Sequence, residues 1–402
     1  MNKNSLSEFF ENYIKSENIF HNKKVLQSSY IPENIIHRDE EIKTVAGMLA
    51  PALKRDLPSN IFIYGKTGTG KTLTILKVTK QMQDIAEQQN IPLKVLYMNC
   101  KLKNIADTEY RLVAELARMM DVEVPKTGLP TSNIYDMFQE AADSSEQILI
   151  LILDEIDQLV KKIGDGILYS LTRMNSDLKK SQIAIIGISN SLTFSEELEP
   201  RVKSSLSEED MVFPPYNALQ IQQILKNRAK LAFKEEVLEP GVIEKCSAFA
   251  ARDHGDARRA LDLLRVAAEV AEREGSGKVG IKHIDVAERK IEKDKVMDIV
   301  KSQPKQFQVT LYSILSVTKD DSSFYTGDVY ESYKKVCSLC GLRPLTQRRI
   351  SDIIVEFDTL GMINAQVMSK GRYGRTRRIS LSVPPTVSPR LKKILEESLG
   401  LN

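Results

Sequence analysis

The 402-residue sequence predicts an α/β domain, with a parallel sheet between two layers of helices, followed by a helical region and a small basic domain. Three observations carry this prediction. Short, continuously apolar runs alternate with longer helical stretches up to about residue 213, residues 214 and 215 are both proline, and positive charge gathers near the C-terminal end. Continuous apolar runs are typical of strands buried on both faces, and the stretches between them are long enough for crossover helices.

The composition is that of a globular protein. Hydrophobic residues make up 42% of the chain and charged residues 28%, which argues against global disorder. The longest apolar run, residues 148–153, is far shorter than the ~18 residues of a membrane span, and the first residues lack the apolar stretch of a secretory signal. Four cysteines do not make a disulfide framework, so we expect a cytoplasmic protein. The formal net charge of +3 alone indicates no affinity for polyanions.

The elements follow in a clear order. Residues 5–20 carry apolar side chains at helical spacing, which predicts a short amphipathic arm that docks on its own domain, with membrane binding as the alternative. The predicted strands are residues 60–64, 94–99, 148–153 and 183–189. Pro214 and Pro215 end this region, because neither can continue a helix or a central strand. Residues 216–297 are then expected to be almost entirely helical, including helices at 218–233 and 257–273.

A phosphate-binding loop follows the first predicted strand. Residues 65–72, GKTGTGKT, fit the pattern GxxxxGK[ST] and precede a helical run at 73–83, which is the context that this motif requires. In such a loop, backbone N–H groups enclose the phosphates and the helix directs its positive dipole end at them. We expect Lys71 to reach the β- and γ-phosphates and the Thr72 hydroxyl to hold Mg²⁺. The predicted ligands are therefore ATP or ADP and Mg²⁺, bound by Gly65, Lys66, Thr67, Gly68, Thr69, Gly70, Lys71, Thr72 and Leu73.

Two carboxylates follow the most apolar strand. Residues 148–155, ILILILDE, deliver Asp154 and Glu155 to the carboxyl end of a buried strand, the edge at which such sheets bind ligands. Asp154 is expected to position Mg²⁺ and its water, and Glu155 to act as the general base on the water that attacks the γ-phosphate. Asp157 is expected only to cap the next helix.

The order of phosphate loop, Asp-Glu strand and helical lid resembles the AAA+ ATPases. Further residues narrow the resemblance to the archaeal origin-recognition and cell-division-cycle type initiators, over essentially the whole chain. They are YIP at 30–32, HR at 37–38, GISN at 187–190, EPRVKSSL at 199–206, FPPYNA at 213–218 and GDARRALDLLR at 255–265. Ser191 and Glu199 stand where this family often has Asp.

The resemblance implies roles for further residues. Asn190 matches sensor 1, which contacts the γ-phosphate or water, although a strand-terminal Asn in a turn is the plainer interpretation. Arg258 matches sensor 2 of the lid, and without the family match it would be an ordinary solvated arginine. Arg201 matches the arginine finger, which acts on a neighbouring subunit's nucleotide and therefore depends on assembly. The contacts to the adenine side would come from Tyr30, Ile31, Arg38 and Tyr216, or this segment would simply pack on the base.

The C-terminal part carries the charge that the total conceals. Residues 341–395 hold eleven Lys and Arg against three Asp and Glu, a net +8, which leaves −5 for the rest of a chain whose total is +3. Such a basic segment is the electrostatic footprint of nucleic-acid binding, and a solvated basic surface without a ligand is the alternative.

The pattern within this segment predicts a winged helix. Thr346 is a plausible N-cap, and Ile350, Ile353, Ile354, Phe357 and Leu360 would form one apolar face before Gly361. Two short strands, at 364–369 and 378–383, would flank a Gly-rich basic turn that resembles a wing. The expected DNA contacts are Gln347, Arg348, Arg349 and Ser351 at the helix start, and Lys370, Arg372, Tyr373, Arg375 and Arg377 in the wing.

Two weaker features remain. The resemblance implies a second DNA contact in an insertion at residues 122–143, at Lys126, Thr127 and Gly128, where a plain helical hairpin is the equal alternative. Cys337 and Cys340 have CxxC spacing, but with no second pair and no histidine nearby we interpret them as helix-end residues and not as zinc ligands.

Together these features predict an α/β AAA+ base with a P-loop at 26–213, after an N-terminal arm at 1–25, then a helical lid at 214–297 and a winged-helix domain at 298–402. The resemblance implies a slow ATPase that initiates DNA replication in the cytoplasm at the nucleoid. Its expected partners are double-stranded origin DNA, other initiator subunits and the replicative helicase, with no membrane. The alternatives are an AAA+ branch-migration motor and a nucleotide-responsive transcription regulator.

Overall fold

The computed structural model describes residues 18–28, 30–101, 107–125, 128–206, 208–318, 324–369, 375–382 and 388–401. The chain forms two compact units, residues 1–284 and 285–402. Most of the predicted arm helix, residues 5–17, lies outside the described residues. Among the described helices, none combines the length and the apolar character needed to span a membrane.

The first unit is built on a five-stranded parallel sheet with the order β2-β3-β4-β1-β5. Its strands are β1 Asn60–Tyr64, β2 Leu93–Asn99, β3 Gln147–Asp154, β4 Ser181–Ser189 and β5 Glu208–Val212. The first four confirm the strands that the apolar runs predict. The sequence does not predict β5, because this edge strand is largely exposed and acidic and therefore has no apolar run.

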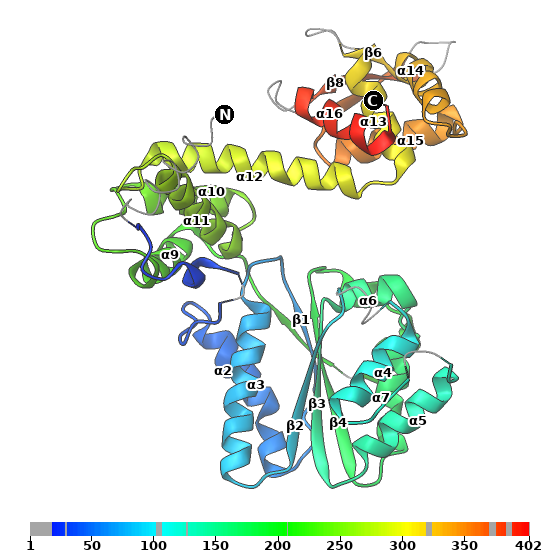
Figure 1. The fold of residues 1–402 in the computed structure, drawn as a ribbon. Coiled ribbons are helices and arrows are strands. Elements are labelled where there is room, and N and C mark those ends of the chain that lie inside the picture. Colours follow the sequence, from blue (N-terminus) through cyan, green and yellow to red (C-terminus); the bar gives the residue numbers. More distant parts are fainter. Residues whose placement is uncertain are drawn as a thin grey trace, which may run out of the picture. The chain divides into compact units, whose positions relative to one another are not determined.

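Helices cover both faces of this sheet (Figure 1). One face carries α2 (Asp39–Leu49) and α3 (Lys71–Gln88), and the other carries α4 (Glu109–Met119), α5 (Thr131–Ala142), α6 (Ile156–Ile163) and α7 (Gly166–Arg173). Buried side chains form one apolar cluster on each face, because β1, β3 and β4 alternate their side chains between two cores. The shorter elements are η1 Lys23–Leu26, η2 Ala50–Lys54, η3 Met174–Ser176, η4 Phe194–Glu196 and α8 Pro200–Leu206.

The strand register aligns the polar ends of four strands. Tyr64 of β1 lies opposite Ser189 of β4, and Asp154 of β3 lies opposite Asn99 of β2. Asp154 also pairs with Ile188. The phosphate loop after β1, the carboxylates after β3 and Asn190 after β4 therefore meet at the same edge of the sheet.

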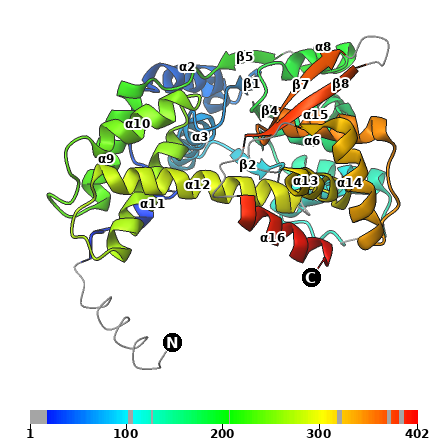
Figure 2. The ribbon, with the colours of Figure 1, turned by 90° about the horizontal axis from the view of Figure 1, so that it is seen from above.

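Three helices form the lid within the first unit: α9 (Ala218–Ala232), α10 (Val242–Arg252) and α11 (Ala257–Arg273), which lie together in Figure 2. The N-terminal segment packs on these helices. Phe20 pairs with Phe233 through a β-bridge, with the two rings stacked 5.2 Å apart, and the Lys23 ammonium lies 2.9 Å from a Glu269 carboxylate oxygen. The lid is therefore made from two stretches that are far apart in the sequence.

The second unit is a winged helix. It contains most of α12 (Ile281–Ser302), then α13 (Lys305–Val317), α14 (Thr326–Leu339), α15 (Gln347–Thr359) and α16 (Ser388–Leu399), with a three-stranded antiparallel sheet of order β6-β8-β7. The strands are β6 Phe324–Tyr325, β7 Ile363–Ser369 and β8 Arg375–Leu381. The predicted lid boundary at residue 297 lies inside α12.

The helix predicted to follow Thr346 is confirmed as α15. The Thr346 hydroxyl accepts a hydrogen bond from the Arg349 N–H at the helix start, and Ile350, Ile353, Ile354 and Phe357 are buried. Leu360 is 43% exposed, so its predicted place on the apolar face is wrong. Its backbone keeps helical angles and its N–H still donates to the Glu356 carbonyl, so the side chain continues the helical repeat but lies at the edge of the apolar face, where the helix ends.

Candidate nucleotide and DNA sites

A cavity of about 550 Å³ opens in the first unit at the polar edge of the sheet. Its wall brings together most of the predicted nucleotide contacts: residues 67–73 of the loop, Asp154, Glu155, Asn190, Tyr30, Tyr216 and Arg258. Tyr97 and Asn99 of β2, and Lys101 two residues after that strand, complete this side. Of the residues predicted to contact nucleotide, Gly65, Lys66, Ile31 and Arg38 do not line the cavity. Its volume is within the usual range for small-molecule sites, roughly 300–1,000 Å³.

The phosphate loop has room for glycine alone where the lid approaches it. Gly68 has a φ of +74°, and a Cβ placed there would lie 1.7 Å from a carboxylate oxygen of Asp256. Asp256 caps α11, and its second oxygen lies 3.4 Å from the Thr67 hydroxyl. The Ala257 N–H also donates to the Gly68 carbonyl, at 3.4 Å. The start of α11 therefore rests directly on the loop.

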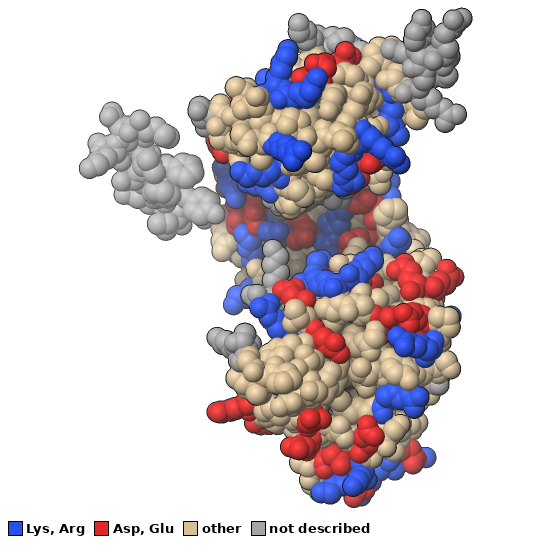
Figure 3. All heavy atoms as spheres, turned by 90° about the vertical axis from the view of Figure 1, so that its right-hand side faces the viewer, with Lys and Arg blue, Asp and Glu red and all other residues tan. Residues whose placement is uncertain are grey.

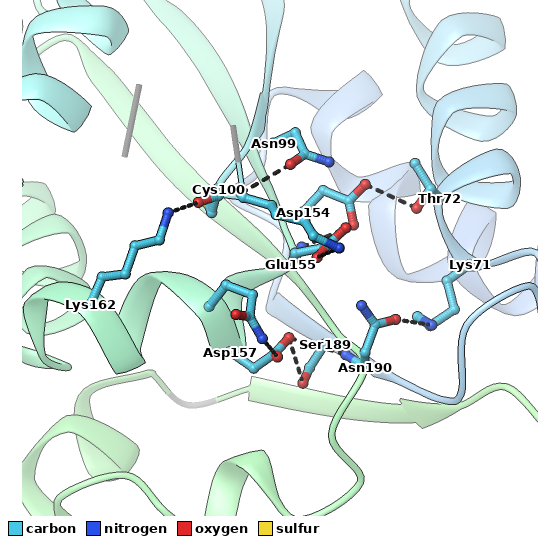
Figure 4. Close-up of polar contacts among 12 residues, drawn as sticks. Lys71, Thr72, Asn99, Cys100, Asp154, Glu155, Asp157, Lys162, Ser189 and Asn190 are labelled. Atoms are coloured by element: carbon cyan, nitrogen blue, oxygen red, sulfur yellow. Dashed lines mark hydrogen bonds and ion pairs between the residues drawn. The ribbon is translucent and has the colours of Figure 1, made fainter. Parts of the chain in front are cut away.

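Lys71 is buried at the start of α3 and is fully engaged by acceptors (Figure 4). Its ammonium donates to the carbonyls of Gly65 and Lys66, each at 2.8 Å, and to Asn190 Oδ1 at 3.0 Å. The pKa of Lys71 is lowered to about 8. Burial is the main cause and nearby Arg258 contributes, while Asp154 acts in the opposite direction. A phosphate would restore the favourable environment for the charged form.

Asp154 is held by three donors at the end of β3. One carboxylate oxygen accepts hydrogen bonds from the Thr72 hydroxyl at 3.0 Å and the Tyr97 hydroxyl at 2.9 Å, and the other accepts the Glu155 N–H at 3.0 Å. Burial, and then Asp154 itself, raise the pKa of Tyr97, so its phenol stays a donor. The sequence does not reveal Tyr97, because only the pairing of β2 with β3 brings the two side chains together.

The oxygens of Thr72 and Asp154 fit a magnesium ion. A hydroxyl and a carboxylate side by side are hard ligands of the kind that Mg²⁺ takes, with water and phosphate oxygens completing its shell. No cluster of three or more His, Cys, Asp or Glu side chains suited to a metal occurs among the described residues. The site therefore offers two protein oxygens and depends on phosphate for the rest.

Glu155 and Asn190 are both oriented by neighbours. Glu155 has a left-handed backbone, with a φ of +56°, and its carboxylate lies 3.4 Å from the Lys101 ammonium. The Asn190 N–H donates to Asp157 Oδ1 at 3.2 Å, and the Ser189 hydroxyl donates to the same oxygen at 3.4 Å (Figure 4). Asp157 is buried and thus positions Asn190, which goes beyond the capping role that the sequence predicts.

Arg201 lies away from the cavity of its own chain. Its side chain is 68% exposed, and its guanidinium lies 2.7 Å from a Glu199 carboxylate oxygen and 5.8 Å from the centre of the Tyr169 ring. The side chain is accessible from outside and carries an immediate counter-ion.

The structure describes some of the predicted DNA contacts in full, some in part and some not at all. Gln347, Arg348 and Arg349 are exposed at the start of α15. Arg349 lies 4.0 Å from Asp352 and 3.9 Å from Glu356, whereas Arg377 donates to the Ser351 hydroxyl and so fastens the wing to the helix. In the wing, Arg375 is described only as the first residue of β8. In the predicted insertion at residues 122–143, Gly128 is described and has a φ of +106°. The remaining predicted contacts lie outside the described residues: Lys126, Thr127, Lys370, Arg372 and Tyr373.

The charge is distributed differently on the two units. Figure 3 shows mainly Lys and Arg among neutral residues on the visible face of the second unit, and a mixture of both signs on the first. The exposed Arg348 and Arg349 at the start of α15 carry the positive charge that binding to a duplex requires.

A P-loop beside an Asp-Glu strand, a lid that rests on the loop and a winged helix define an AAA+ ATPase with a DNA-binding domain. Comparison with known families agrees over all three parts. Residues 55–193 match the AAA domain, residues 222–289 match the Cdc6 AAA+ ATPase-type lid domain, and residues 298–387 match the CDC6 C-terminal winged helix domain.

The chain belongs to the family of archaeal ORC1-type DNA replication proteins. It is 50% identical over 390 residues to the ORC1-type DNA replication protein of Thermococcus onnurineus, and the aligned region covers 96% of this chain and 93% of the relative. It is 52% identical over 383 residues to that of Pyrococcus furiosus, covering 94% and 90%. Among solved structures it resembles the Aeropyrum pernix ORC1 protein in complex with DNA, with a TM-score of 0.83, 41% identity, and coverage of 95% of this chain and 98% of that one.

Proposed function

We propose that this protein is an ATP-dependent replication initiator that binds double-stranded origin DNA and recruits the replicative helicase, with the ATP or ADP state as a switch. One observation carries the proposal: the lid helix α11 rests on the phosphate loop and contributes Arg258 to the same cavity as Lys71, Asp154 and Asn190. Bound phosphate would therefore act on the lid as well as on the sheet. The ORC1 relative solved with DNA supports the choice of ligand for the winged helix.

The proposed roles follow from the geometry. Lys71 and the loop N–H groups bind the phosphates, Thr72 and Asp154 hold Mg²⁺, and Glu155 orients the attacking water. Asn190 and Arg258 report the γ-phosphate, and Tyr30 and Tyr216 lie beside the nucleoside part. Arg201 would serve the site of a neighbouring subunit.

We further propose that hydrolysis is slow. Glu155 is bound to Lys101 at 3.4 Å, so the base must leave an ion pair before it can take a proton. In this assignment residues 26–213 are the nucleotide-binding base, 214–297 the lid and 298–402 the DNA-binding domain. Since its target is chromosomal DNA, the protein acts at the nucleoid.

Footprinting on genomic DNA of the source organism, with ATP and with ADP, tests the proposal directly. We expect protection at clustered repeats near a replication start, with an extent that depends on the nucleotide. Junction-specific protection would instead favour a branch-migration motor. Protection of promoters alone would favour a transcription regulator.

The Glu155→Gln variant tests the catalytic part. ATP binding should persist because the loop is untouched, while turnover should fall at least about 100-fold, the low end of the usual contribution of a general base. A variant that keeps its turnover would remove Glu155 from the mechanism. A wild-type protein without turnover would make nucleotide a mere ligand.

A further inference from the structure

Arg38 is a buried cation that does not reach the ligand cavity. The residue is only 2% exposed, and it is absent from the cavity wall, although the family resemblance predicts it as a nucleotide contact. Burying a guanidinium is costly unless its donors find partners. The partners of Arg38 therefore indicate what the residue does.

Three separate elements share the Arg38 guanidinium. Nε donates to the Thr69 carbonyl of the phosphate loop at 2.9 Å, and Nη2 donates to the Pro214 carbonyl, in the linker that leads to the lid, at 2.5 Å. Nη1 donates to the Glu41 carboxylate of α2, also at 2.5 Å. The guanidinium carbon lies 4.1 Å from the centre of the Tyr216 ring, which holds the plane of the group against the linker.

The bond to Thr69 bears on phosphate binding. In a trans peptide the carbonyl and the following N–H point in opposite directions, so an acceptor fixed on one side fixes a donor on the other. With the Thr69 carbonyl held by Arg38, the Gly70 N–H is directed away from Arg38, and Gly70 is one of the residues that line the cavity. Arg38 thus orients a phosphate donor without touching phosphate.

The bond to Pro214 bears on the lid. Residues 213–217 connect β5 to α9, and the Phe213 N–H at their start donates to the Tyr64 carbonyl at 2.7 Å. A Cβ on Gly70 would lie 2.8 Å from the Tyr216 hydroxyl, so the linker and the loop are already in close contact. A shift of the loop on phosphate binding would therefore act on the linker through this guanidinium as well as through the Tyr216 contact.

We propose that Arg38 is a positioning residue that couples the occupancy of the phosphate loop to the conformation of the lid linker. The inference rests on the proposed nucleotide binding at the loop and adds the route by which the bound state reaches the lid. A second buried arginine provides a contrast. Arg228 donates to the Val25 and Tyr30 carbonyls at 3.3 and 3.4 Å and stacks 4.5 Å from the Tyr30 ring, but these bonds join the lid to the N-terminal segment and not to the loop.

The test uses the full-length protein and a fluorescent ADP analogue with Mg²⁺. Arg38→Lys keeps the charge but cannot present the planar set of donors that reaches all three acceptors. We expect its affinity for the analogue to fall about tenfold, as for the loss of one charge-assisted bond. At saturating analogue, amide hydrogen exchange in the peptide 208–220 should no longer slow, although it slows in the wild type. Arg228→Lys is the matched control. Arg228 lines the cavity, so this control is read only at saturating analogue, where the nucleotide-dependent slowing should persist.

The outcomes distinguish a failure of the Arg38 coupling from a failure of the proposed nucleotide site. Wild-type affinity and wild-type slowing in Arg38→Lys would overturn the coupling, and so would weaker affinity with normal slowing at saturation. If Arg38→Lys does not fold, Glu41→Gln, which removes one partner of the guanidinium, decides in the same way with a smaller expected change. Failure of the wild type to bind the analogue, or binding unaffected by Lys71→Met, would refute the proposed nucleotide site itself.

Discussion

Raising the pH should weaken nucleotide binding through Lys71 before it affects the fold. The buried ammonium has a pKa of about 8 in the ligand-free site, against 10.5 for an unperturbed lysine, because burial penalises its charge. A bound phosphate compensates that charge, so binding requires the protonated form. Above pH 8, each binding event must therefore take up a proton that the empty site has lost.

The magnitude follows from this pKa. With Lys71 fully charged in the complex, the dissociation constant should rise about tenfold per pH unit above pH 8, and about 30-fold by pH 9.5. The neighbouring phenol and thiol do not interfere, because burial raises the pKa of Tyr97 well above this window and that of Cys100 to about 12.

The assay is a titration with a fluorescent ADP analogue from pH 7 to pH 9.5, on the wild type and on Lys71→Met. The variant has no proton to lose at this position and should bind weakly with a flat profile, which the wild type approaches at high pH. A flat wild-type profile, or an equal slope in the variant, would refute the reasoning. The pKa of Lys71 is lower in the folded than in the unfolded protein, so unfolding takes up a proton between about pH 8 and about pH 10.5. The ligand-free protein should therefore gain stability against unfolding as the pH rises through this range.

Three further predictions concern single side chains. Tyr97→Phe removes one anchor of Asp154 and should raise the Mg²⁺ concentration for half-maximal nucleotide binding about tenfold, leaving metal-free binding unchanged. Arg348→Ala should lower the slope of log affinity for DNA against log salt by about one, whereas Arg349→Ala should lower it less, because acids already neutralise Arg349; equal slopes would contradict this. Tyr333→Phe should cost about 1–3 kcal/mol in urea unfolding, because its buried hydroxyl donates to Gln306 and accepts the Leu345 N–H; a cost near zero would mean that water replaces these partners.

The central strands and the helix α15 are predictable because their signal is local. Buried strands need continuous apolarity, and α15 repeats its apolar residues at helical spacing behind a Thr346 cap. The strand β5 has neither signal, since Glu208, Glu209 and Asp210 occupy an exposed sheet edge. What defines β5 is its pairing with β1, which no local pattern records.

The nucleotide site likewise contains residues that a local pattern predicts and residues that only the fold brings together. The phosphate loop and the Asp-Glu pair are contiguous motifs, so the sequence predicts both of them, and also the helix that follows the loop. Tyr97 and Asp157 act on Asp154 and Asn190 only through strand order and register. The partners of Arg38 are likewise invisible in the sequence, because the motif that contains it does not tell which carbonyls its side chain will bind.

The N-terminal segment on the lid has a consequence for synthesis on the ribosome. Phe20 emerges early, but its partner Phe233 follows only after the whole sheet has been made. At roughly 5–20 residues per second, the segment waits on the order of ten to forty seconds with its apolar side chains unpartnered. The lid is therefore completed only after the sheet, when the two distant stretches join. Any fragment that starts after residue 20 would leave the Phe233 ring without its stacking partner.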